Sequence, residues 1–129
     1  MNDFYIVDNV LLKYKGFDET VVIPDGVRVI GRQAFCFKSG IKKVVIPEDA
    51  ISIGDAAFDS CIDLEEIVIP DSVEEIGVGA FSGCSALKKV NLPASLSYIP
   101  SRCFVNCRSV SEINIPDEIT YIGDRAFVG

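Results

Sequence analysis

The sequence contains no histidine, and this absence excludes several kinds of catalytic and metal site. Serine–histidine and cysteine–histidine nucleophile pairs need that side chain, as do zinc sites built on imidazole. The cysteines form no C-x-x-C pair, and the phosphate-cradling motifs G-x-x-x-x-G-K-[ST] and G-x-G-x-x-G are missing. The many turn carboxylates form no D-x-D-x-D-G calcium loop. We therefore expect no enzyme, no catalytic residues, no cofactor and no metal site.

Long apolar runs are also missing. No stretch approaches the roughly 20 consecutive apolar residues of a membrane-spanning helix. The start, Met1-Asn2-Asp3-Phe4, lacks the basic residues and the apolar run of a signal peptide. Two alternatives follow for the localisation: the protein stays inside the cell, or the chain is a piece of a longer one.

Basic residues are outnumbered, with 12 Lys and Arg against 19 Asp and Glu, a formal net charge of −7. Nucleic acids and anionic membranes are bound by basic faces, so this balance argues against both as partners. The simplest reason for the acidity is solubility. With 49% hydrophobic residues, the chain of 129 residues is expected to form one ordered domain.

The chain repeats itself every 23 residues. The spacing holds in a proline column (Pro24, Pro47, Pro70, Pro93, Pro116), an isoleucine column (Ile30, Ile53, Ile76, Ile99, Ile122) and a phenylalanine column (Phe35, Phe58, Phe81, Phe104, Phe127). A fixed period of this length is the signature of a solenoid in which stacked repeats share one core. We predict four full repeats and a partial fifth in residues 21–129. The break at Val128-Gly129, partway through a repeat, favours a piece of a longer chain.

Each column has a predicted structural role. Valine- and isoleucine-rich residues before each proline predict short parallel strands at 21–23, 44–46, 67–69, 90–92 and 113–115, which proline ends because it has no N–H. A second short strand is expected near 74–76. The run Ala80-Phe81-x-x-Cys84 fits one or two helical turns, with the phenylalanine column as the spine of the core.

The glycine column Gly31, Gly54, Gly77 and Gly123 aligns with Pro100 in the fourth repeat. Proline cannot adopt positive φ. The column therefore indicates a close approach between repeats, unless the fourth repeat bends differently.

Five cysteines leave the redox state open. Cys61, Cys84 and Cys107 share one repeat column, and Cys103 takes an alanine position. Repeat positions and an odd number favour free thiols buried in the core. Stacked repeats bring neighbouring cysteines near disulfide distance, so oxidation stays an alternative.

The row I-x-I-P-x-x-V-x-x-I-G-x-x-A-F-x-x-C-x-x-L, spelled out by Ile67–Leu87, resembles the BspA-type leucine-rich repeats over about residues 21–129. The resemblance implies a leucine-rich repeat solenoid, an α/β-type right-handed coil with its parallel strands on a concave side. It also implies a role in binding proteins or other macromolecules. Many members of that family look like parts of bacterial surface proteins, so a fragment of a longer chain would lie at the cell surface or be secreted.

Residues 1–20 precede the repeats. Two apolar runs flank Asp8-Asn9, a pair that tolerates positive φ, and predict a β-hairpin that caps the first repeat, followed by a link. A binding hairpin is the alternative. In the link, Phe17 is expected to supply the apolar contact that Ile41 and Leu64 make later.

The outward positions of the strand ladder are the candidate partner-binding site: Val22, Lys43, Val45, Glu66, Val68, Lys89, Asn91, Glu112 and Asn114. Charges alternate down one column (Thr20, Lys43, Glu66, Lys89, Glu112) and down a second (Lys42, Glu65, Lys88). They predict either a mixed-charge docking site or a solvated ladder that fixes the register. The middle column changes from valine to asparagine, which suits a polypeptide partner or no partner at all.

Two functions remain open. The first is a non-catalytic module that binds a protein or glycan partner, of unknown identity, through the strand-lined face. The second is a structural spacer in a larger bacterial surface protein, with no ligand of its own. The fifth repeat has no polar cap after it, so we also expect an exposed apolar edge and self-association through it.

Overall fold

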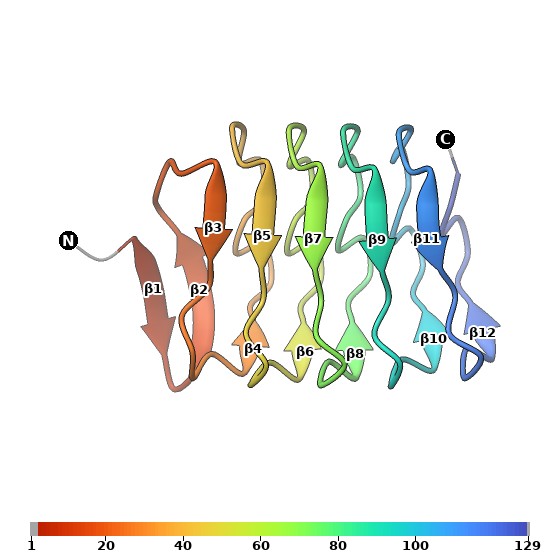
Figure 1. Ribbon diagram of the computed structural model, residues 1–129, viewed down its shortest axis with the longest axis horizontal. Coiled ribbons are helices and arrows are strands. Elements are labelled where there is room, and N and C mark those ends of the chain that lie inside the picture. The colour runs from red at the N-terminus through yellow and green to blue at the C-terminus, as the bar shows by residue number, and fades with distance from the viewer. Residues whose placement is uncertain (1–2, 129) are drawn as a thin grey trace.

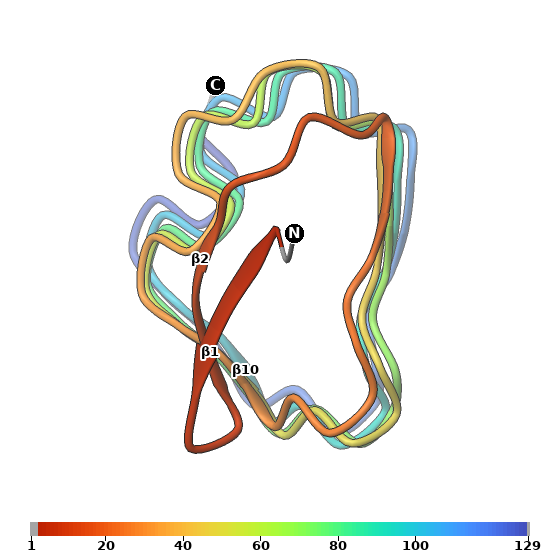
Figure 2. The same ribbon diagram turned by 90° about the vertical axis from the view of Figure 1, so that its left-hand side faces the viewer.

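The computed structural model describes residues 3–128. Met1 and Asn2 of the predicted segment 1–20, and Gly129 of the predicted repeat segment 21–129, lie outside the described residues. The chain winds into a solenoid whose coils stack side by side in a nearly straight row (Figure 1). Seen along the row, the coils superimpose closely (Figure 2). The predicted solenoid of parallel strands is therefore confirmed, although the row shows no marked concave side.

The longer ladder is a five-stranded parallel sheet with the order β11-β9-β7-β5-β3. Its strands are β3 (Thr20–Val22), β5 (Lys43–Val45), β7 (Glu66–Val68), β9 (Lys89–Asn91) and β11 (Glu112–Asn114). Each strand begins and ends one residue earlier than the sequence predicts. The register is one whole repeat, with Val21 beside Val44 and Val44 beside Ile67.

The shorter ladder is interrupted once. Its strands are β4 (Val29–Ile30), β6 (Ser52–Ile53), β8 (Glu75–Ile76), β10 (Tyr98–Ile99) and β12 (Tyr121–Ile122), and they form separate sheets on either side of the gap between β8 and β10. Elsewhere a backbone N–H after the strand donates to the coil before it, as in Gly54 N to Ile30 O at 2.7 Å and Gly123 N to Ile99 O at 2.6 Å. Pro100 has no N–H, so this bond cannot form between β8 and β10.

The glycine column is a close approach between coils, as predicted. None of its four glycines has a positive φ. A Cβ on Gly54 would lie 2.8 Å from Arg32 N, and one on Gly123 would clash with Ser101 N. Side chains are thus excluded because the backbone of the preceding coil occupies the space.

The predicted helical turns are wrong: residues 3–128 contain no helix. The segments around each phenylalanine are consecutive turns, in which two residues per coil take positive φ, such as Gly79 at 65° and Gly83 at 74°. The amides between them donate across coils, as Phe58 N does to Ala80 O at 2.8 Å. Amides used in this way cannot build the i→i−4 bonds of a helix.

A file of aromatic rings forms the spine of the core, as predicted. Successive centroids along Phe4, Tyr14, Phe35, Phe58, Phe81, Phe104 and Phe127 are 4.9–5.5 Å apart. From Tyr14 onwards the rings are stacked, with interplanar angles of 4° between Phe58 and Phe81 and 6° between Phe81 and Phe104. The alanine column and the isoleucine column as far as Ile99 are buried beside them, whereas Ile122 is exposed.

The chain begins with an antiparallel hairpin of β1 (Phe4–Val7) and β2 (Val10–Tyr14), with Asp8 and Asn9 at positive φ in its turn. β2 runs parallel to β4 and so extends the shorter ladder at its N-terminal end. In the link that follows, Phe17 is 92% exposed, with Lys38 Nζ 5.0 Å from the ring centroid. The apolar contact predicted for Phe17 is therefore wrong, because the ring lies in solvent at the surface, where the Lys38 ammonium approaches it.

The last coil has an open apolar side. Side chains that are buried in earlier coils are exposed there: Phe127 is 45% exposed, whereas Phe81 is fully buried. The exposed residues of this C-terminal edge are Ile115, Tyr121, Ile122, Phe127 and Val128. No described residue follows to cover them.

Truncating Phe81 tests the aromatic spine. Phe81→Ala removes a fully buried ring stacked on both sides, and we expect it to lower the free energy of unfolding by about 3–5 kcal/mol. Urea unfolding measures the change. The control is Val78→Ala, at a 48% exposed position of the same coil, which should change stability by less than about 1 kcal/mol. Equal losses in both variants would contradict a shared core along the rings.

The open edge predicts reversible self-association of this 129-residue chain. Multi-angle light scattering over a concentration series should show mass rising with concentration. Tyr121→Lys and Ile122→Lys, both on exposed side chains of β12, should restore a monomer without unfolding the coils. A strict monomer at high concentration would contradict the prediction.

Candidate functional site

The outward positions of the longer ladder form one surface, which we call the ladder face. Each strand holds its middle residue inward and its first and third residues outward, because side chains alternate along a strand. All nine candidate residues lie at such first or third positions: Val22, Lys43, Val45, Glu66, Val68, Lys89, Asn91, Glu112 and Asn114. The structure thus brings them together on one sheet.

Three valines form an apolar stripe on the ladder face. Val22 lies beside Val45, and Val45 lies beside Val68, in direct register. Val22 is 63% exposed and Val68 is 40% exposed, while Val45 is partly buried between them. Neighbouring strands in a sheet are about 4.8 Å apart, so the three side chains form a continuous patch.

The two asparagines that continue the stripe differ in what they offer. Asn114 uses its side chain within the ladder: its Oδ1 accepts from Leu92 N at 2.7 Å, and its Nδ2 donates to Leu92 O at 3.2 Å. The side chain replaces the backbone bond that Val45 O makes with Ile23 N in an earlier coil. Asn91 is exposed, and no contact of its amide group is seen in the described part of the chain. Only one of the two amides is therefore available to a partner.

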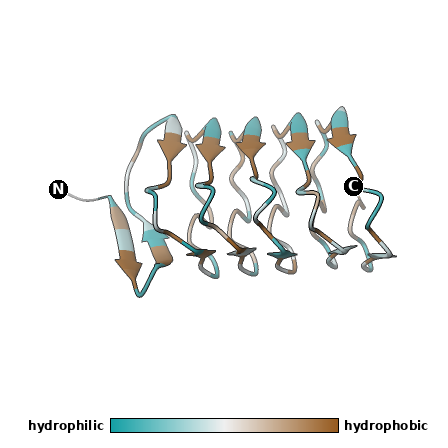
Figure 3. Ribbon diagram, turned by 60° about the horizontal axis from the view of Figure 1, so that its bottom comes forward, coloured by the Kyte–Doolittle hydropathy of each residue, from teal (hydrophilic) through white to brown (hydrophobic). Residues whose placement is uncertain are grey.

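The alternating charges are in register, but few of them touch. Lys43 Nζ lies 3.9 Å from Glu66 Oε2, and Lys88 Nζ lies 4.0 Å from Glu65 Oε1. These are the ion pairs found among residues 3–128. The side chains of Lys43 and Glu66 are 40% and 43% exposed, so each such pair is worth only about 0–1 kcal/mol. Figure 3 shows the hydrophilic starts of these strands side by side along the sheet.

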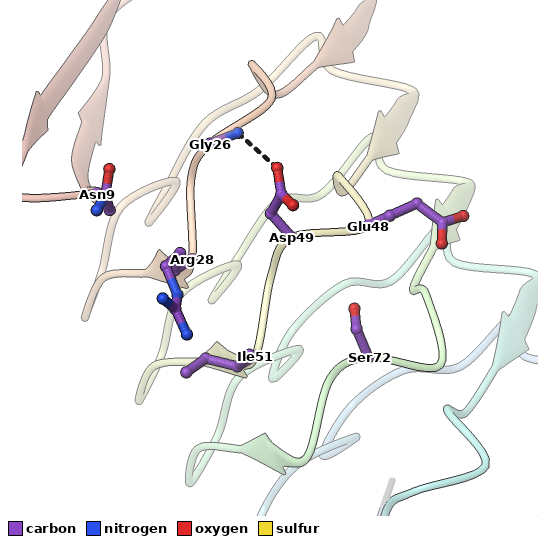
Figure 4. Close-up of a pocket in the computed structure, with 7 residues that line it drawn as sticks. All are labelled: Asn9, Gly26, Arg28, Glu48, Asp49, Ile51 and Ser72. Carbon is purple, nitrogen blue, oxygen red and sulfur yellow. Dashed lines mark hydrogen bonds between the residues drawn. The ribbon is translucent and has the colours of Figure 1, made fainter.

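A pocket separate from the ladder face lies where the hairpin turn meets the turns after Pro24 and Pro47 (Figure 4). It has a volume of about 530 Å³ and is lined by Asn9, Gly26, Arg28, Glu48, Asp49, Ile51 and Ser72. Two of these side chains hold neighbouring coils together: Asp49 Oδ2 accepts from Gly26 N at 2.9 Å, and Ser72 Oγ donates to Ala50 O at 2.7 Å. Sequence reasoning missed this cavity, since Gly26, Asp49 and Ser72 share one repeat column but carry different side chains, and Asn9 comes from the hairpin outside the predicted repeats.

The cysteine column serves the contact between coils. Cys61 Sγ and Cys84 Sγ each lie 3.1 Å from a backbone carbonyl of the preceding coil, Phe35 O and Phe58 O. Cys107 makes the same contact to Phe81 O at 3.0 Å. All five cysteines of the chain are free thiols. A small side chain with a weak donor suits this column, because it fills the core and satisfies a carbonyl oxygen.

Burial makes these thiols unreactive. It raises the pKa of Cys61 to about 12 and that of Cys107 to about 11, mainly because desolvation penalises the thiolate. The pKa values of Cys84 and Cys103 are also raised, by the same cause. A thiolate is the form that attacks or binds a metal, so the column is poorly suited to nucleophilic chemistry.

Other kinds of site are not seen in the described part of the chain. Within residues 3–128, no three His, Cys, Asp or Glu side chains are grouped so that they could hold a metal ion. The same residues include no helix of the length and apolarity that crossing a membrane requires.

Residues 7–129 match the family model of the BspA type leucine-rich repeat region, in six copies. The chain belongs to this family. The match starts at residue 7, inside the hairpin, whereas the sequence shows the resemblance over about residues 21–129. The structure explains the difference: β2 pairs with β4 as a coil strand would, and the Tyr14 ring stacks on Phe35.

Solved structures of bacterial leucine-rich repeat proteins resemble this BspA-type chain. A leucine-rich cell surface protein of Faecalibacterium prausnitzii A2-165 shares 26% identity with a TM-score of 0.72, over 98% of this chain and 44% of that one. A leucine-rich repeat protein of Bacteroides ovatus shares 27% with a TM-score of 0.70, over 92% and 36%. This chain therefore spans less than half the length of either relative. No curated protein matches it significantly.

The burial of the Cys61 thiol can be tested through the pH dependence of the free energy of unfolding. Its pKa lies near 12 in the fold against about 9 in an unfolded chain, so its stabilising effect is complete below about pH 9 and is lost as the pH rises towards 12. Cys61→Ala lacks this dependence. The wild type should therefore lose about 2 kcal/mol of unfolding free energy relative to Cys61→Ala between about pH 7.5 and about pH 10.5. We call this difference between the two proteins the stability gap.

Urea unfolding at both pH values measures this gap. Ile62→Ala, at an exposed neighbouring position without a titrating group, is the control and should keep a constant gap. A constant gap for Cys61→Ala as well would mean that the thiol is not desolvated in the fold.

Proposed function

We propose that this BspA-type solenoid is a non-catalytic module that binds a protein or glycan partner on the ladder face. The observation that carries the proposal is the exposed stripe of Val22, Val45 and Val68, held in register by the sheet. Apolar side chains that stack in an exposed row mark an interaction surface more often than single exposed ones do.

The surroundings of the stripe support the same proposal. Lys43 and Glu66 lie on one side of it, at the first positions of the same strands, and Asn91 continues it with an unengaged amide. An apolar centre with a polar rim is the usual arrangement of a protein interface. The strands are rigid parts of the fold, so the surface is formed before a partner arrives and little ordering entropy is lost on binding.

The hairpin fits this function as a cap. Leu11 and Tyr14 are fully buried against the first coil, so β2 covers one side of an apolar interior that would otherwise face water. A solenoid needs such an end to remain soluble. The Faecalibacterium protein is described as a cell surface protein, which supports a place at the cell surface for this chain too.

A structural spacer is the alternative function. It is favoured by the way the ladder uses its own polar groups, since Asn114 bonds to Leu92 and Lys43 pairs with Glu66. Under this alternative the ladder face has no partner, and the stack only separates other parts of a larger protein.

Valine substitutions on and off the ladder face separate the two functions. Val68→Glu places a charge in the middle of the stripe, and Val78→Glu places the same charge at a similarly exposed position on the turn after β8. We expect ligands found on peptide and glycan arrays to bind Val68→Glu at least about tenfold more weakly and to bind Val78→Glu unchanged. Thermal unfolding of both variants checks that the fold is intact.

The outcomes are distinct. Equal binding by both variants would place the site elsewhere on the molecule. Arrays without any ligand for the wild type would favour the spacer.

Charge reversals refine the map. Lys43→Glu and Glu66→Lys should each weaken a ligand that contacts the rim, by up to about fivefold, since exposed ion pairs contribute about 0–1 kcal/mol. The double reversal restores the pair within the ladder but presents each charge at the wrong place. If a partner binds both single variants and the double variant as tightly as the wild type, this part of the ladder face does not belong to its binding site.

A further inference from the structure

The starts of the longer strands alternate in charge from coil to coil. We call the first residue of each strand of the longer ladder, together with the residue before it, the strand start. The five strand starts are Glu19-Thr20, Lys42-Lys43, Glu65-Glu66, Lys88-Lys89 and Ser111-Glu112. The sheet places each pair directly beside the next, as Lys43 beside Glu66 and Glu112 beside Lys89. Every internal coil contact therefore joins an acidic start to a basic one.

The backbone fixes this arrangement. At each contact the amides of one start donate to a single carbonyl of the coil before it: Lys42 N to Glu19 O at 2.7 Å, Glu65 N to Lys42 O at 2.8 Å, and Ser111 N to Lys88 O at 3.0 Å. A coil placed one repeat out of order would keep these bonds but would set lysine beside lysine. Like charges directly opposite each other destabilise a sheet, so the alternation selects which coil follows which.

At the C-terminal edge, the backbone groups that make this contact in earlier coils have no partner among the described residues. Ser111 O occupies the position of Glu19 O and Lys42 O, but no described residue donates to it. The amides of Arg125 and Phe127 likewise have no acceptor among residues 3–128, although Arg102 N and Phe104 N donate to Asp124 O and Ala126 O. The apolar side chains of this edge are exposed beside these groups.

We propose that the C-terminal edge binds one further coil-forming segment of 23 residues whose strand start carries lysines. The internal contacts supply the argument: an edge that starts with Ser111-Glu112 follows the alternation only when the next start is basic, like Lys43 beside Glu66. The segment would donate its amides to Ser111 O, accept from Arg125 N and Phe127 N, and stack a ring on Phe127.

The N-terminal end of a second copy fits this edge less well. Its first start is Glu19-Thr20, so end-to-end stacking would set Glu19 beside Ser111 and leave Glu112 without a cation. Both ends of the chain are thus acidic at the strand starts. Copies that pair through their apolar edges do so without the charge match, and a lysine-bearing segment should displace them.

Three synthetic peptides test the proposal against the intact chain. The first has the sequence of residues 65–87, starting with two glutamates. The second carries Glu65→Lys and Glu66→Lys, which places the lysines beside Ser111 and Glu112. The third carries Glu74→Lys and Glu75→Lys, so it has the same net charge as the second, but its lysines would lie beside Thr120 and Tyr121.

We expect the second peptide to bind about two- to fivefold more tightly than the third, the change that one exposed ion pair produces. In the variant Glu112→Lys, which alters an exposed side chain, the third peptide, whose strand start keeps both glutamates, should bind more tightly than the second. Isothermal titration calorimetry measures the affinities. Equal binding of the second and third peptides, or an order that Glu112→Lys leaves unchanged, would overturn the proposal.

Fused segments keep the test decisive where free peptides bind too weakly to measure. The same three segments, joined after Gly129 through residues 61–64 so that the 23-residue register is kept, should slow amide exchange of Arg125 and Phe127 most when the lysines are at the strand start. Equal protection by all three would overturn the proposal. A chain that pairs only with itself, and whose pairing no peptide displaces, would assign the edge to a second copy instead. None of these outcomes depends on a partner at the ladder face.

Discussion

The contact between one coil and the next is the interaction on which this structure depends. A single 23-residue coil encloses too little to bury its own apolar side chains, so each coil needs a neighbour on both sides. The phenylalanine file shows this need most directly, because Phe58, Phe81 and Phe104 each cover the ring before and after them. Where the neighbour is missing, the same column is exposed at Phe127.

Several columns are shaped by this one contact. Glycine follows four of the five shorter strands, where the preceding backbone leaves no room for a Cβ. Cysteine is favoured after the phenylalanine because its thiol reaches a carbonyl of the coil before it. Pro100 stands in the glycine column without an N–H, and the shorter ladder is interrupted at that point. The ladder face is an outcome of the same stacking, since the repeat that aligns the cores also aligns Val22, Val45 and Val68.

The sequence predicts the repeated features well and the local ones poorly. Period, strand positions, core columns and the exposed last coil follow from residues that recur, because five aligned positions outweigh any single propensity. The helical turns were wrong because Ala80-Phe81-x-x-Cys84 has helical spacing, whereas the positive φ of Gly79 and Gly83 directs the amides to the next coil. The spacing of buried residues does not distinguish a helix from successive turns. The hydrogen bonds of the Asn114 side chain and the exposed position of Phe17 beside Lys38 depend on contacts that no repeat column encodes.

Amide hydrogen exchange along the phenylalanine column is the most direct test of the coil-to-coil contact. Phe58 N and Phe81 N donate to the next coil at 2.8 Å and 3.0 Å, whereas Phe127 N has no acceptor in the described chain. Under conditions where the chain is monomeric, Phe58 and Phe81 should exchange only through global unfolding, and Phe127 should exchange at nearly the rate of a free peptide. Rapid exchange at Phe81, or equal protection of Phe81 and Phe127, would contradict a stack held together by identical contacts between coils.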